Sequence, residues 1–318
     1  MILVDLNQVM ISNLMMQIGS KKASVEEDLV RHMVLNSLRL YRKKFGEKYG
    51  ELVICCDDKN YWRRDFFPYY KAHRKKDRAE SGLDWHMIFE VLNGIRDDLK
   101  HTFPYKVIQV DRAEADDVIA SLCHEYGDLG VTNGSDPILI LSSDKDFVQL
   151  VTDKIILYRP IEKEYYTNKT VFDKFGVLAE NFIIYKTLLG DNSDRIPGVK
   201  GLGEKGIFKK FPELKTDPLT LDDIFDISAR KFKEHVVYSR IVHDRTKLEN
   251  SYKIMDLSVP MVDDQQIEYL DYLIEEKFPD LNSKMFIQLY NEDKLGGMIR
   301  NLDIWLKEKF YHFKGYKD

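Results

Sequence analysis

The segment PILILSSDKDFVQLV, residues 137–151, indicates the fold class of this chain. A run of branched apolar residues, typical of a strand buried on both faces, ends in two serines and is followed by Asp144 and Asp146. Two carboxylates placed so close together repel each other strongly in a low-dielectric crevice. The segment therefore predicts a buried strand whose carboxyl end needs positive charge nearby.

Further apolar segments of the same kind alternate with segments of helical periodicity. The predicted strands lie at 1–6, 51–57, 105–110, 137–143 and 154–160, and the predicted helices at 25–45, 84–99 and 113–127. This alternation is typical of an α/β fold with a mainly parallel central sheet flanked by helices. After about residue 180 the chain changes to helical segments separated by turns, ending with one at 298–310. We therefore expect an α/β domain at residues 1–180 packed against a helical lobe at residues 181–318.

Composition excludes several classes of protein. The hydrophobic content of 44% supports a folded core, and the longest apolar runs are far too short to span a bilayer. The N-terminus carries Asp5 and no basic lead-in, so it is not expected to be a signal peptide. The three cysteines are too few for a disulfide framework. We expect a cytoplasmic monomer with reduced thiols and no membrane partner.

Acidic residues recur at the ends of the predicted strands and in the turns that follow. They are Asp5, Asp57, Glu114, Asp116, Asp117, Asp144, Asp146, Asp191 and Asp194. An acid at such a place usually caps a helix or forms a turn, but capping does not explain a pattern that recurs along the chain. Ligands of open parallel sheets bind outside the carboxyl ends of the strands, where we expect most of these acids to converge.

A set of carboxylates of this size favours hard divalent cations. Mg²⁺ prefers oxygen ligands and keeps several waters, which suits a site rich in carboxylates. Nine acids exceed what one ion needs, so the sequence predicts two ions, which together can polarise a phosphodiester, activate water and stabilise the leaving oxygen. The eight histidines are scattered along the chain and give no cluster typical of a zinc site.

Two segments are candidates for binding nucleic acid, although the net charge of the chain is −5. Residues 63–78 contain seven Lys or Arg and two Asp with interleaved Tyr and Phe. That mixture suits a single strand, and the alternative is a solvated loop with incidental charge. The segment RIPGVKGLGEKG, residues 195–206, places glycines before a helix expected from Glu204, and such a turn exposes backbone N–H groups to phosphate. The lysines that add charge there are Lys200, Lys205, Lys209 and Lys210.

Six motifs together resemble the structure-specific 5′-nuclease superfamily, which includes flap endonucleases, the 5′-nuclease domain of bacterial DNA polymerase I and phage 5′-exonucleases. They are Asp5, CCDD at 55–58, YWRRDFFPYYKAHR at 61–74, EADDVIA at 114–120, SSDKDF at 142–147 and GDNSDRIPGVKGLGEKG at 190–206. The stretches YWRRDF and DWHMIFE are most similar to the ribonuclease H branch of the T-even phages. The resemblance implies a PIN-like nuclease core, a helical arch at residues 59–95, and a helix-hairpin-helix at about residues 186–212 in the lobe.

The resemblance also implies a role for each candidate residue. The acids implied for one metal are Asp5, Asp57, Glu114 and Asp116, those for the other are Asp144, Asp146 and Asp191, and those in shared or outer positions are Asp117 and Asp194. The residues implied in catalysis are Lys71 and Arg74, which face the scissile phosphate, with Asp5, Asp57, Asp144 and Asp146. The residues implied to contact nucleic acid are Arg63, Arg64, Lys71, Arg74, Lys75, Lys76, Gly198, Lys200, Gly201, Gly203 and Lys205.

The implied cofactors are two Mg²⁺ ions, for which Mn²⁺ can substitute, and a K⁺ ion at the hairpin. The implied activity is that of a 5′→3′ exonuclease and flap endonuclease that removes RNA primers and 5′ flaps during DNA replication. Its implied substrates are DNA and RNA–DNA hybrids with 5′ ends, flaps or nicks. By family analogy the last hundred residues dock a single-strand-binding protein or sliding clamp, and a phage-encoded chain would work in the cytoplasm of a bacterial host.

Three alternatives remain open at this point. A haloacid-dehalogenase-like phosphatase also places acids at strand ends, but Asp5-Leu6-Asn7 does not supply the D-x-D that it needs on the first strand. A DNA-junction-binding protein without turnover is disfavoured by the complete set of acids. A PIN-type RNA endonuclease would not need the glycine hairpin.

Overall fold

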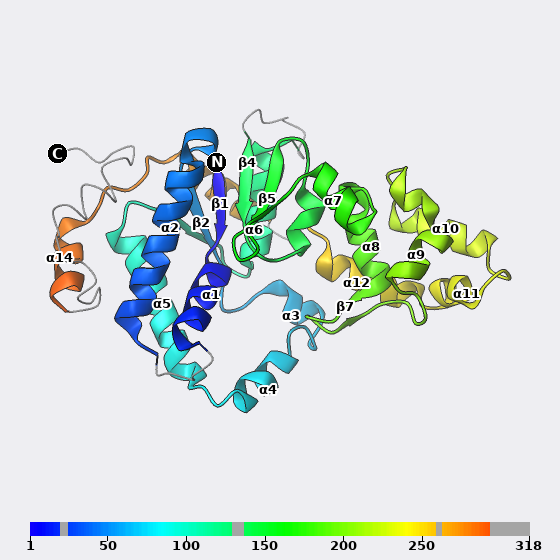
Figure 1. Ribbon diagram of the computed structural model, residues 1–318, viewed down its shortest axis with the longest axis horizontal. Coiled ribbons are helices and arrows are strands. Elements are labelled where there is room, and N and C mark those ends of the chain that lie inside the picture. The colour runs from blue at the N-terminus through cyan, green and yellow to red at the C-terminus, as the bar shows by residue number, and fades with distance from the viewer. Residues whose placement is uncertain (20–24, 129–136, 259–262, 293–318) are drawn as a thin grey trace.

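The structure is a computed structural model that describes residues 1–19, 25–128, 137–258 and 263–292 (Figure 1). Within these ranges a six-stranded sheet forms the centre of the α/β domain. Its strands are β1 (Ile2–Asp5), β2 (Leu52–Cys56), β3 (Lys106–Gln109), β4 (Ile138–Leu141), β5 (Ile155–Arg159) and β6 (Glu164–Tyr166). The first five lie within the predicted strands, whereas β6 was not predicted because three residues are too few to show a period.

The order of the strands places the acidic turns around β1. The order is β3-β2-β1-β4-β5-β6, with β1 to β5 parallel and β6 antiparallel at one edge. Asp5 lies beside Cys55 of β2, and Val4 lies beside Leu141 of β4, so these three carboxyl ends are level. The order reverses between β1 and β4, and such a switch point opens a crevice for ligands.

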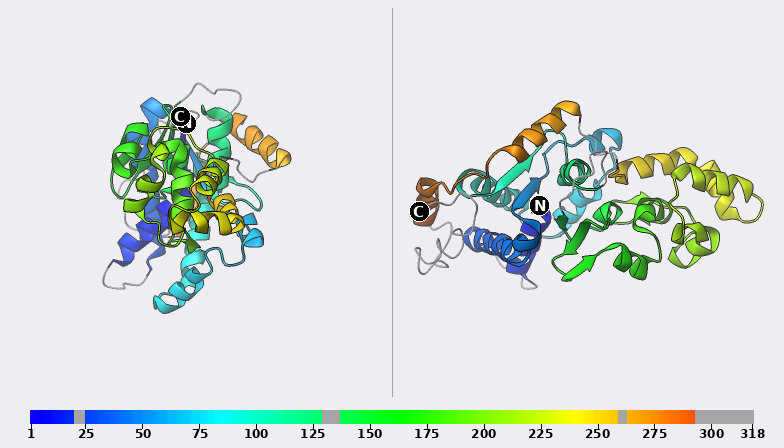
Figure 2. Two further views of the ribbon diagram at one scale, coloured as in Figure 1. Left: turned by 90° about the vertical axis from the view of Figure 1, so that its right-hand side faces the viewer. Right: turned by 90° about the horizontal axis from the view of Figure 1, so that it is seen from above.

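Helices cover both faces of the sheet, because alternate strand residues point to opposite sides (Figure 2). Ile2 and Val4 pack on one face with apolar residues of α1, α2 and α5, whereas Leu3 packs on the other face with α6. These helices are α1 (Leu6–Ile18), α2 (Glu27–Tyr49), α5 (Trp85–Thr102) and α6 (Ala115–Tyr126). The sequence predicted α2, α5 and α6 but not α1, which starts directly after β1 and contacts α2. Among the described helices, none is both long and apolar enough to cross a membrane.

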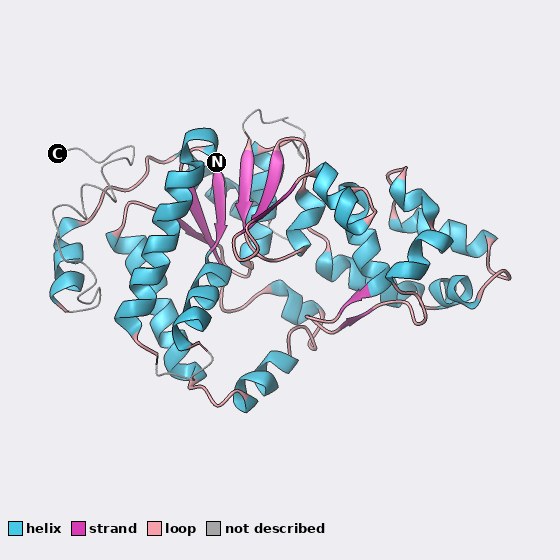
Figure 3. Ribbon diagram, viewed as in Figure 1, coloured by secondary structure: helices cyan, strands magenta, loops and turns pink. Residues whose placement is uncertain are grey.

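The arch segment runs along the carboxyl edge of the sheet as two short helices and their loops (Figure 3). They are α3 (Trp62–Phe66) and α4 (His73–Glu80). Helix α4 has no buried residue, so it is held by polar contacts and its neighbours along the chain. The last part of the predicted arch, residues 85–95, is instead the start of α5, whose Ile88, Val91 and Leu92 are buried against the core.

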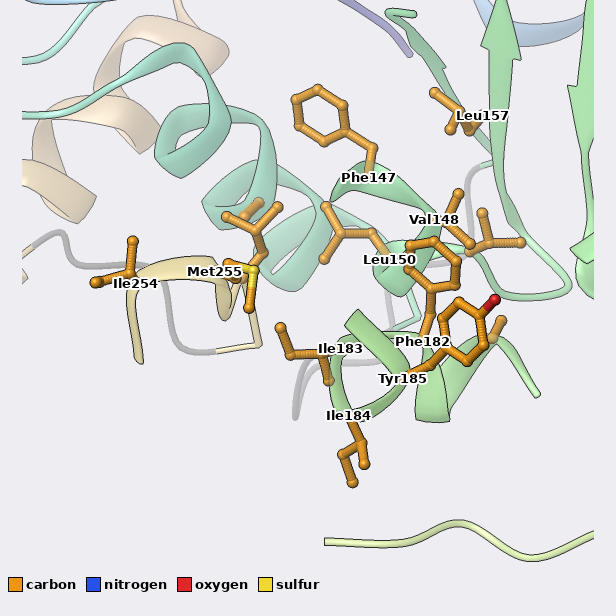
Figure 4. Close-up of a cluster of buried hydrophobic side chains, with 14 of the residues drawn as sticks. Phe147, Val148, Leu150, Leu157, Phe182, Ile183, Ile184, Tyr185, Ile254 and Met255 are labelled. Carbon is orange, nitrogen blue, oxygen red and sulfur yellow. The ribbon is translucent and has the colours of Figure 1, made fainter. Parts of the chain in front are cut away.

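The lobe continues the hydrophobic core of the α/β domain without a break. Phe147 and Leu150, which follow the acidic turn after β4, belong to the same cluster as Phe182, Ile183 and Met255 of the lobe (Figure 4). Helix α7 (Asn168–Phe175) follows β6 and contacts it, and the lobe helices that come after it are α8 (Phe182–Leu189), α9 (Glu204–Lys210), α10 (Leu221–Arg230), α11 (Val236–His243) and α12 (Arg245–Met255). Short 3₁₀ helices lie at Asp146–Leu150, Ala179–Asn181 and Pro212–Lys215. This shared core ties the acidic turn rigidly to the lobe.

The chain returns to the α/β domain after residue 262. Helix α13 (Asp264–Glu275) contacts β3, and α14 (Ser283–Asn291) contacts α5. The Lys106 ammonium on β3 donates to the carbonyls of Leu273, Ile274 and Glu276 at the end of α13. The prediction that residues 181–318 form one lobe is therefore wrong for these two helices, because amphipathic periodicity does not reveal which apolar surface a helix covers. The predicted helix at 298–310 lies outside the described residues.

Candidate metal centre and nucleic-acid interface

A cleft of about 1630 Å³ lies at the carboxyl edge of the sheet. Residues from α1, the arch, α5, the start of α6, the turn after β4, α8 and the glycine hairpin line it. The predicted acids among the lining residues are Asp5, Asp57, Glu114, Asp116, Asp144, Asp146 and Asp191. The expected convergence of acids from five separate segments is therefore present.

Asp5 and Asp57 sit at the ends of neighbouring strands and are held by hydrogen bonds. Asp5 accepts from Gln8 N at 3.1 Å, which caps α1, and from Ser142 Oγ at 2.8 Å. Asp57 accepts from Ala115 N at 2.8 Å and from the amide of Asn7. Burial, together with the charge of Asp57, raises the pKa of Asp5 to about 7. Burial and the charge of Glu114 raise the pKa of Asp57 as well, and the charge of Lys71 offsets this rise only in part.

The acidic turn after β4 is built around Ser142 and Asp144. Ser142 Oγ accepts from Asp144 N at 3.0 Å, and Asp144 Oδ1 accepts from Asp146 N at 2.9 Å. These bonds direct both carboxylates toward the cleft that they line. Burial, and then the charge of Asp144, raise the pKa of Asp146 to about 7.

Lys186 is a residue of this site that the sequence analysis missed. Its ammonium donates to Asp191 Oδ2 at 2.7 Å and also contacts Asp146 Oδ1. Burial alone would raise the pKa of Asp191, but Lys186 and the hydrogen bonds of Ser193 bring it down to about 2. The pKa of Asp146 stays high beside the same lysine because burial and the charge of Asp144 both disfavour its ionised form. The available signal was a single lysine in the apolar stretch FIIYKTLL.

Glu114 and Asp116 open α6 and differ in their environment. The Lys71 ammonium donates to Glu114 Oε1 at 2.9 Å. Burial favours the neutral form of Glu114, but Lys71 and Arg63 outweigh it, so the pKa of Glu114 is lowered. Burial raises the pKa of Asp116 well above its ordinary value despite the nearby Lys71. Lys71 itself has a φ of +53°, in the left-handed region, where the arch chain turns to present its side chain.

Arg63 and Asp117 form a buried ion pair behind the residues that line the cleft. Arg63 is only 2% exposed, and its guanidinium donates to both carboxylate oxygens of Asp117, at 2.8 and 2.9 Å. It also donates to Glu114 at 2.9 Å and to the carbonyl of Ile254 at 2.9 Å. Asp117 is fully buried and also accepts from Trp62 Nε1 at 3.2 Å. Arg63 is therefore buried and lies outside the residues that line the cleft, and Asp117, which fills the Arg63 guanidinium, holds an outer position. The roles that the resemblance implied for these two residues stay predictions.

Asp194 does not line the cleft itself, but it borders a small adjoining pocket together with Asp116 and Asp146. It is 7% exposed and accepts from Arg74 Nη2 at 2.9 Å, so it pairs with the arch. The predicted basic residues Arg64, Lys75 and Lys76 are exposed on the arch. The arch therefore presents positive charge to solvent above a cleft that is lined with negative charge.

The glycine hairpin joins α8 to α9 through a ribbon of two short strands, β7 (Gly190–Asp191) and β8 (Ile196–Pro197). A Cβ on Gly198 would lie 2.2 Å from the carbonyl of Leu189, so only glycine allows this close backbone contact. Gly201 has a φ of +84°, and a Cβ on Gly203 would have no atom within 4 Å. Lys200 and Lys205 are exposed beside them. The hairpin thus offers open backbone at Gly203 with nearby positive charge, whereas Arg240 donates to the Lys200 carbonyl at 2.6 Å beside Gly201.

The donor atoms of the cleft are carboxylate oxygens, the type of ligand that a hard divalent cation prefers. They include the carboxylate oxygens of Asp5, Asp57 and Asp146, and the pKa values of these three residues are raised mainly by burial. Among the residues that the structure describes, no three acidic, His or Cys side chains stand close enough to hold an ion as they are. The ammonium of Lys71 donates to Glu114, and that of Lys186 donates to Asp191. Cations that bind this site would therefore compete with these two lysines for carboxylate oxygens.

Comparisons with known proteins agree with this geometry. Residues 2–176 match the sequence model of the family described as 5′-3′ exonuclease, N-terminal resolvase-like domain. Ribonuclease H of Enterobacteria phage T4 is 37% identical over 202 residues, 62% of this chain and 62% of that protein. The 5′-3′ exonuclease of Buchnera aphidicola subsp. Schizaphis graminum is 27% identical over 225 residues, 70% of this chain and 74% of that protein. The chain thus spans about three fifths of the phage T4 protein.

A solved structure shows the same fold. It is a complex of the bacteriophage T5 flap endonuclease with DNA and metal ions. The TM-score is 0.69 at 20% identity, and the alignment covers 86% of this chain and 97% of that chain. The family match spans more than half of the sequence, from β1 to α7. The chain described here therefore belongs to the 5′-3′ exonuclease family.

Proposed function

We propose that this chain is a divalent-cation-dependent 5′-nuclease that removes RNA primers and 5′ flaps during DNA replication. The observation that carries the proposal is the cleft, in which carboxylates from five segments face a basic arch. The names of the related proteins support it, since they include a ribonuclease H, 5′-3′ exonucleases and a flap endonuclease solved with DNA and metal ions. The substrates would be DNA and RNA–DNA hybrids with 5′ ends, flaps or nicks.

Two Mg²⁺ ions, replaceable by Mn²⁺, fit the oxygen donors of the cleft. The residues that would hold them are Asp5, Asp57, Glu114 and Asp116 for one ion, and Asp144, Asp146 and Asp191 for the other. When bound, such ions lower the pKa of a coordinated water and neutralise charge on the leaving oxygen. The raised pKa values of Asp5 and Asp146 support this assignment, because they mark carboxylates that need a cation to stay ionised.

The side chains of the arch would act on the phosphate itself. Lys71 reaches the cleft from the arch and donates to Glu114, so its ammonium is within reach of a phosphate bound among the acids. Once Glu114 is engaged by a cation, Lys71 would be free to stabilise charge developing on the phosphate. Arg74 also lines the cleft and would act in the same way after leaving Asp194. Positioning and charge neutralisation would supply the rate enhancement.

The hairpin would hold the backbone of the duplex. Its exposed glycine backbone and lysines suit phosphate contacts that carry no base readout. A K⁺ ion at the hairpin carbonyls and a single-strand-binding protein or sliding clamp as partner stay predictions from the family resemblance. Affinity for DNA should fall steeply with salt, since phosphate contacts release counterions.

The test uses three substrates labelled at the 5′ end: a flap, a nicked duplex and an RNA primer annealed to DNA. Cleavage near the 5′ end is expected with Mg²⁺ and not with EDTA. Asp146→Asn should abolish cleavage and keep DNA binding, because it removes a metal ligand and a repulsive charge together. Asp173→Asn, an exposed acid on α7, serves as the matched control and should cleave normally. Binding of all three substrates without Mg²⁺-dependent cleavage would instead favour a junction-binding protein.

A further inference from the structure

The glycine hairpin is braced by a helix that comes about thirty residues after it in the chain. Helix α11 lies beside α9 (Figure 1), and the Tyr238 hydroxyl of α11 donates to the carbonyl of Lys210, the last residue of α9, at 3.1 Å. Tyr238 also packs edge-on against Phe211, with ring centroids 5.7 Å apart. Val237 and Ile241 are buried, so α11 has a fixed position beside the hairpin.

Arg240 reaches the hairpin from this helix. Its Nη1 donates to the Lys200 carbonyl at 2.6 Å. A Cβ on Gly201 would lie 3.0 Å from the same nitrogen, so the guanidinium lies directly against the hairpin backbone. Hydrogen bonds from a charged donor are stronger than those between neutral groups. Arg240 therefore places a positive charge on the carbonyl side of the hairpin.

The carbonyls of the hairpin are occupied by donors from within the protein. Those that accept hydrogen bonds include Val199, Lys200 and Gly203. The Gly203 oxygen accepts from two amides, Gly206 N at 2.8 Å and Ile207 N at 3.0 Å. A K⁺ ion, which the family resemblance implies at this hairpin, would have to share such oxygens with their donors. At the Lys200 carbonyl it would also lie close to the Arg240 guanidinium, and like charges repel. The hairpin carbonyls thus fit an internal cation better than a free K⁺ ion.

Arg240 has donors left for a ligand. A guanidinium carries five N–H donors in a planar fork, and the Lys200 carbonyl occupies only the nitrogen Nη1. The Arg240 side chain is partly exposed, and no carboxylate of the described residues forms an ion pair with it. Phosphate oxygens match the planar fork well. The remaining N–H groups therefore suit a phosphate bound beside the open backbone at Gly203.

We propose that Arg240 is the built-in cation of the glycine hairpin: it holds the Lys200 carbonyl and binds a phosphate of the duplex, so that duplex binding does not need K⁺. This inference rests on the proposed function, since it takes the hairpin as the duplex site. A guanidinium fixed on α11 stays at the hairpin in any salt, whereas a K⁺ ion must be bound from solution. Binding should therefore respond to ionic strength through counterion release, and not to the identity of the monovalent cation.

The test measures affinity for a blunt duplex by fluorescence anisotropy, with Ca²⁺ in place of Mg²⁺ to fill the carboxylates. KCl is replaced by tetramethylammonium chloride at equal ionic strength, because that cation is too large to bind among carbonyl oxygens. The wild-type affinity should change by less than about twofold. Arg240→Gln should lose about tenfold in tetramethylammonium chloride and should lower the salt slope of binding by about one. Arg240→Lys should recover part of the affinity, since it keeps the charge without the planar fork.

Arg245→Gln is the matched control, because Arg245 follows α11 closely and is exposed, but its guanidinium is paired with Asp222 and Glu249. This variant should keep the wild-type affinity and salt slope.

The proposal is overturned if the wild-type protein loses affinity severalfold without K⁺, which would support the K⁺ ion that the resemblance implies. It is also overturned if Arg240→Gln binds like the wild type, if its salt slope is unchanged, or if Arg245→Gln loses as much. A wild-type protein that binds no duplex in either salt and cleaves none of the three substrates labelled at the 5′ end would instead refute the proposed function.

Discussion

Lys186 and Asp191 form an ion pair of 2.7 Å at the C-terminal end of α8, and the ammonium of Lys186 also contacts Asp146. The pair is mostly buried, with both side chains 12% exposed. Lys186 therefore supplies positive charge to the acids of the cleft while no cation is bound. This relationship explains how so many carboxylates remain together in the folded chain.

Lys186→Met should destabilise the metal-free protein by on the order of 2–3 kcal/mol, because it leaves two partly buried carboxylates without a partner. Mg²⁺ should restore much of that loss by neutralising the same oxygens. Urea unfolding with EDTA or Mg²⁺ measures both effects. Lys174→Met is the control, since its pair with Glu164 is about 40% exposed on both sides and should contribute far less to stability. Equal losses for both variants would contradict a special role for Lys186.

The stability of the metal-free protein should fall as the pH rises from about 4 to about 7. The pKa values of Asp5 and Asp146 are raised to about 7 in the folded state, so the folded chain binds more protons than the unfolded chain in this range. The free energy of unfolding then decreases as the pH rises, and the stabilising contribution of these protonated carboxyl groups is lost above their folded pKa. Urea unfolding at pH 5 and pH 7.5 measures this change.

Divalent cations should stabilise the folded protein more as the pH rises, because they compete with protons for the same carboxylates. Mg²⁺ should therefore raise the unfolding midpoint more at pH 7.5 than at pH 5. A Mg²⁺ effect that is equal at the two pH values would show that the cation binds elsewhere.

Lys71→Ala should slow cleavage by about 10²-fold or more while weakening DNA binding only modestly, because its charge would be needed on the phosphate in the transition state. Single-turnover rates and affinities on the flap substrate separate the two effects. Lys76→Ala is the control on the same arch: it is exposed, pairs with Glu80 at 3.6 Å and does not line the cleft. If Lys71→Ala changed affinity alone, Lys71 would be a tether for the strand.

Arg63→Met should cost about 3–5 kcal/mol of folding stability, because it leaves Asp117 buried without a cation and leaves Glu114 with Lys71 alone. The free energy of unfolding in urea tests this directly. An exposed phosphate contact would behave differently, with unchanged stability and a smaller salt slope of DNA binding. That second outcome would support the role that the family resemblance implied for Arg63.

Much of the fold follows from local patterns that are short and strong. Five apolar strands alternate with helical segments, and parallel pairing needs level carboxyl ends, so the acids that follow β1, β2 and β4 were expected at one edge and are found there. Helix α1 escaped prediction because its apolar residues are mixed with Asn, Gln and Ser and its amphipathic period is weak. Helical periodicity depends only on residues near one another along the chain, so it did not show that α13 and α14 pack on the α/β domain.

Residue types and their spacing along the chain are enough to predict the α/β sheet, the acidic edge and the basic arch, since these depend on neighbours a few positions apart. Burial and pairing depend on contacts between distant segments. Arg63 and Lys71 look alike in a basic stretch, yet one is sealed against Asp117 and the other reaches the cleft. The role of Lys186 likewise becomes visible only when packing brings its ammonium beside the acids, because a charge acts through space and not along the chain.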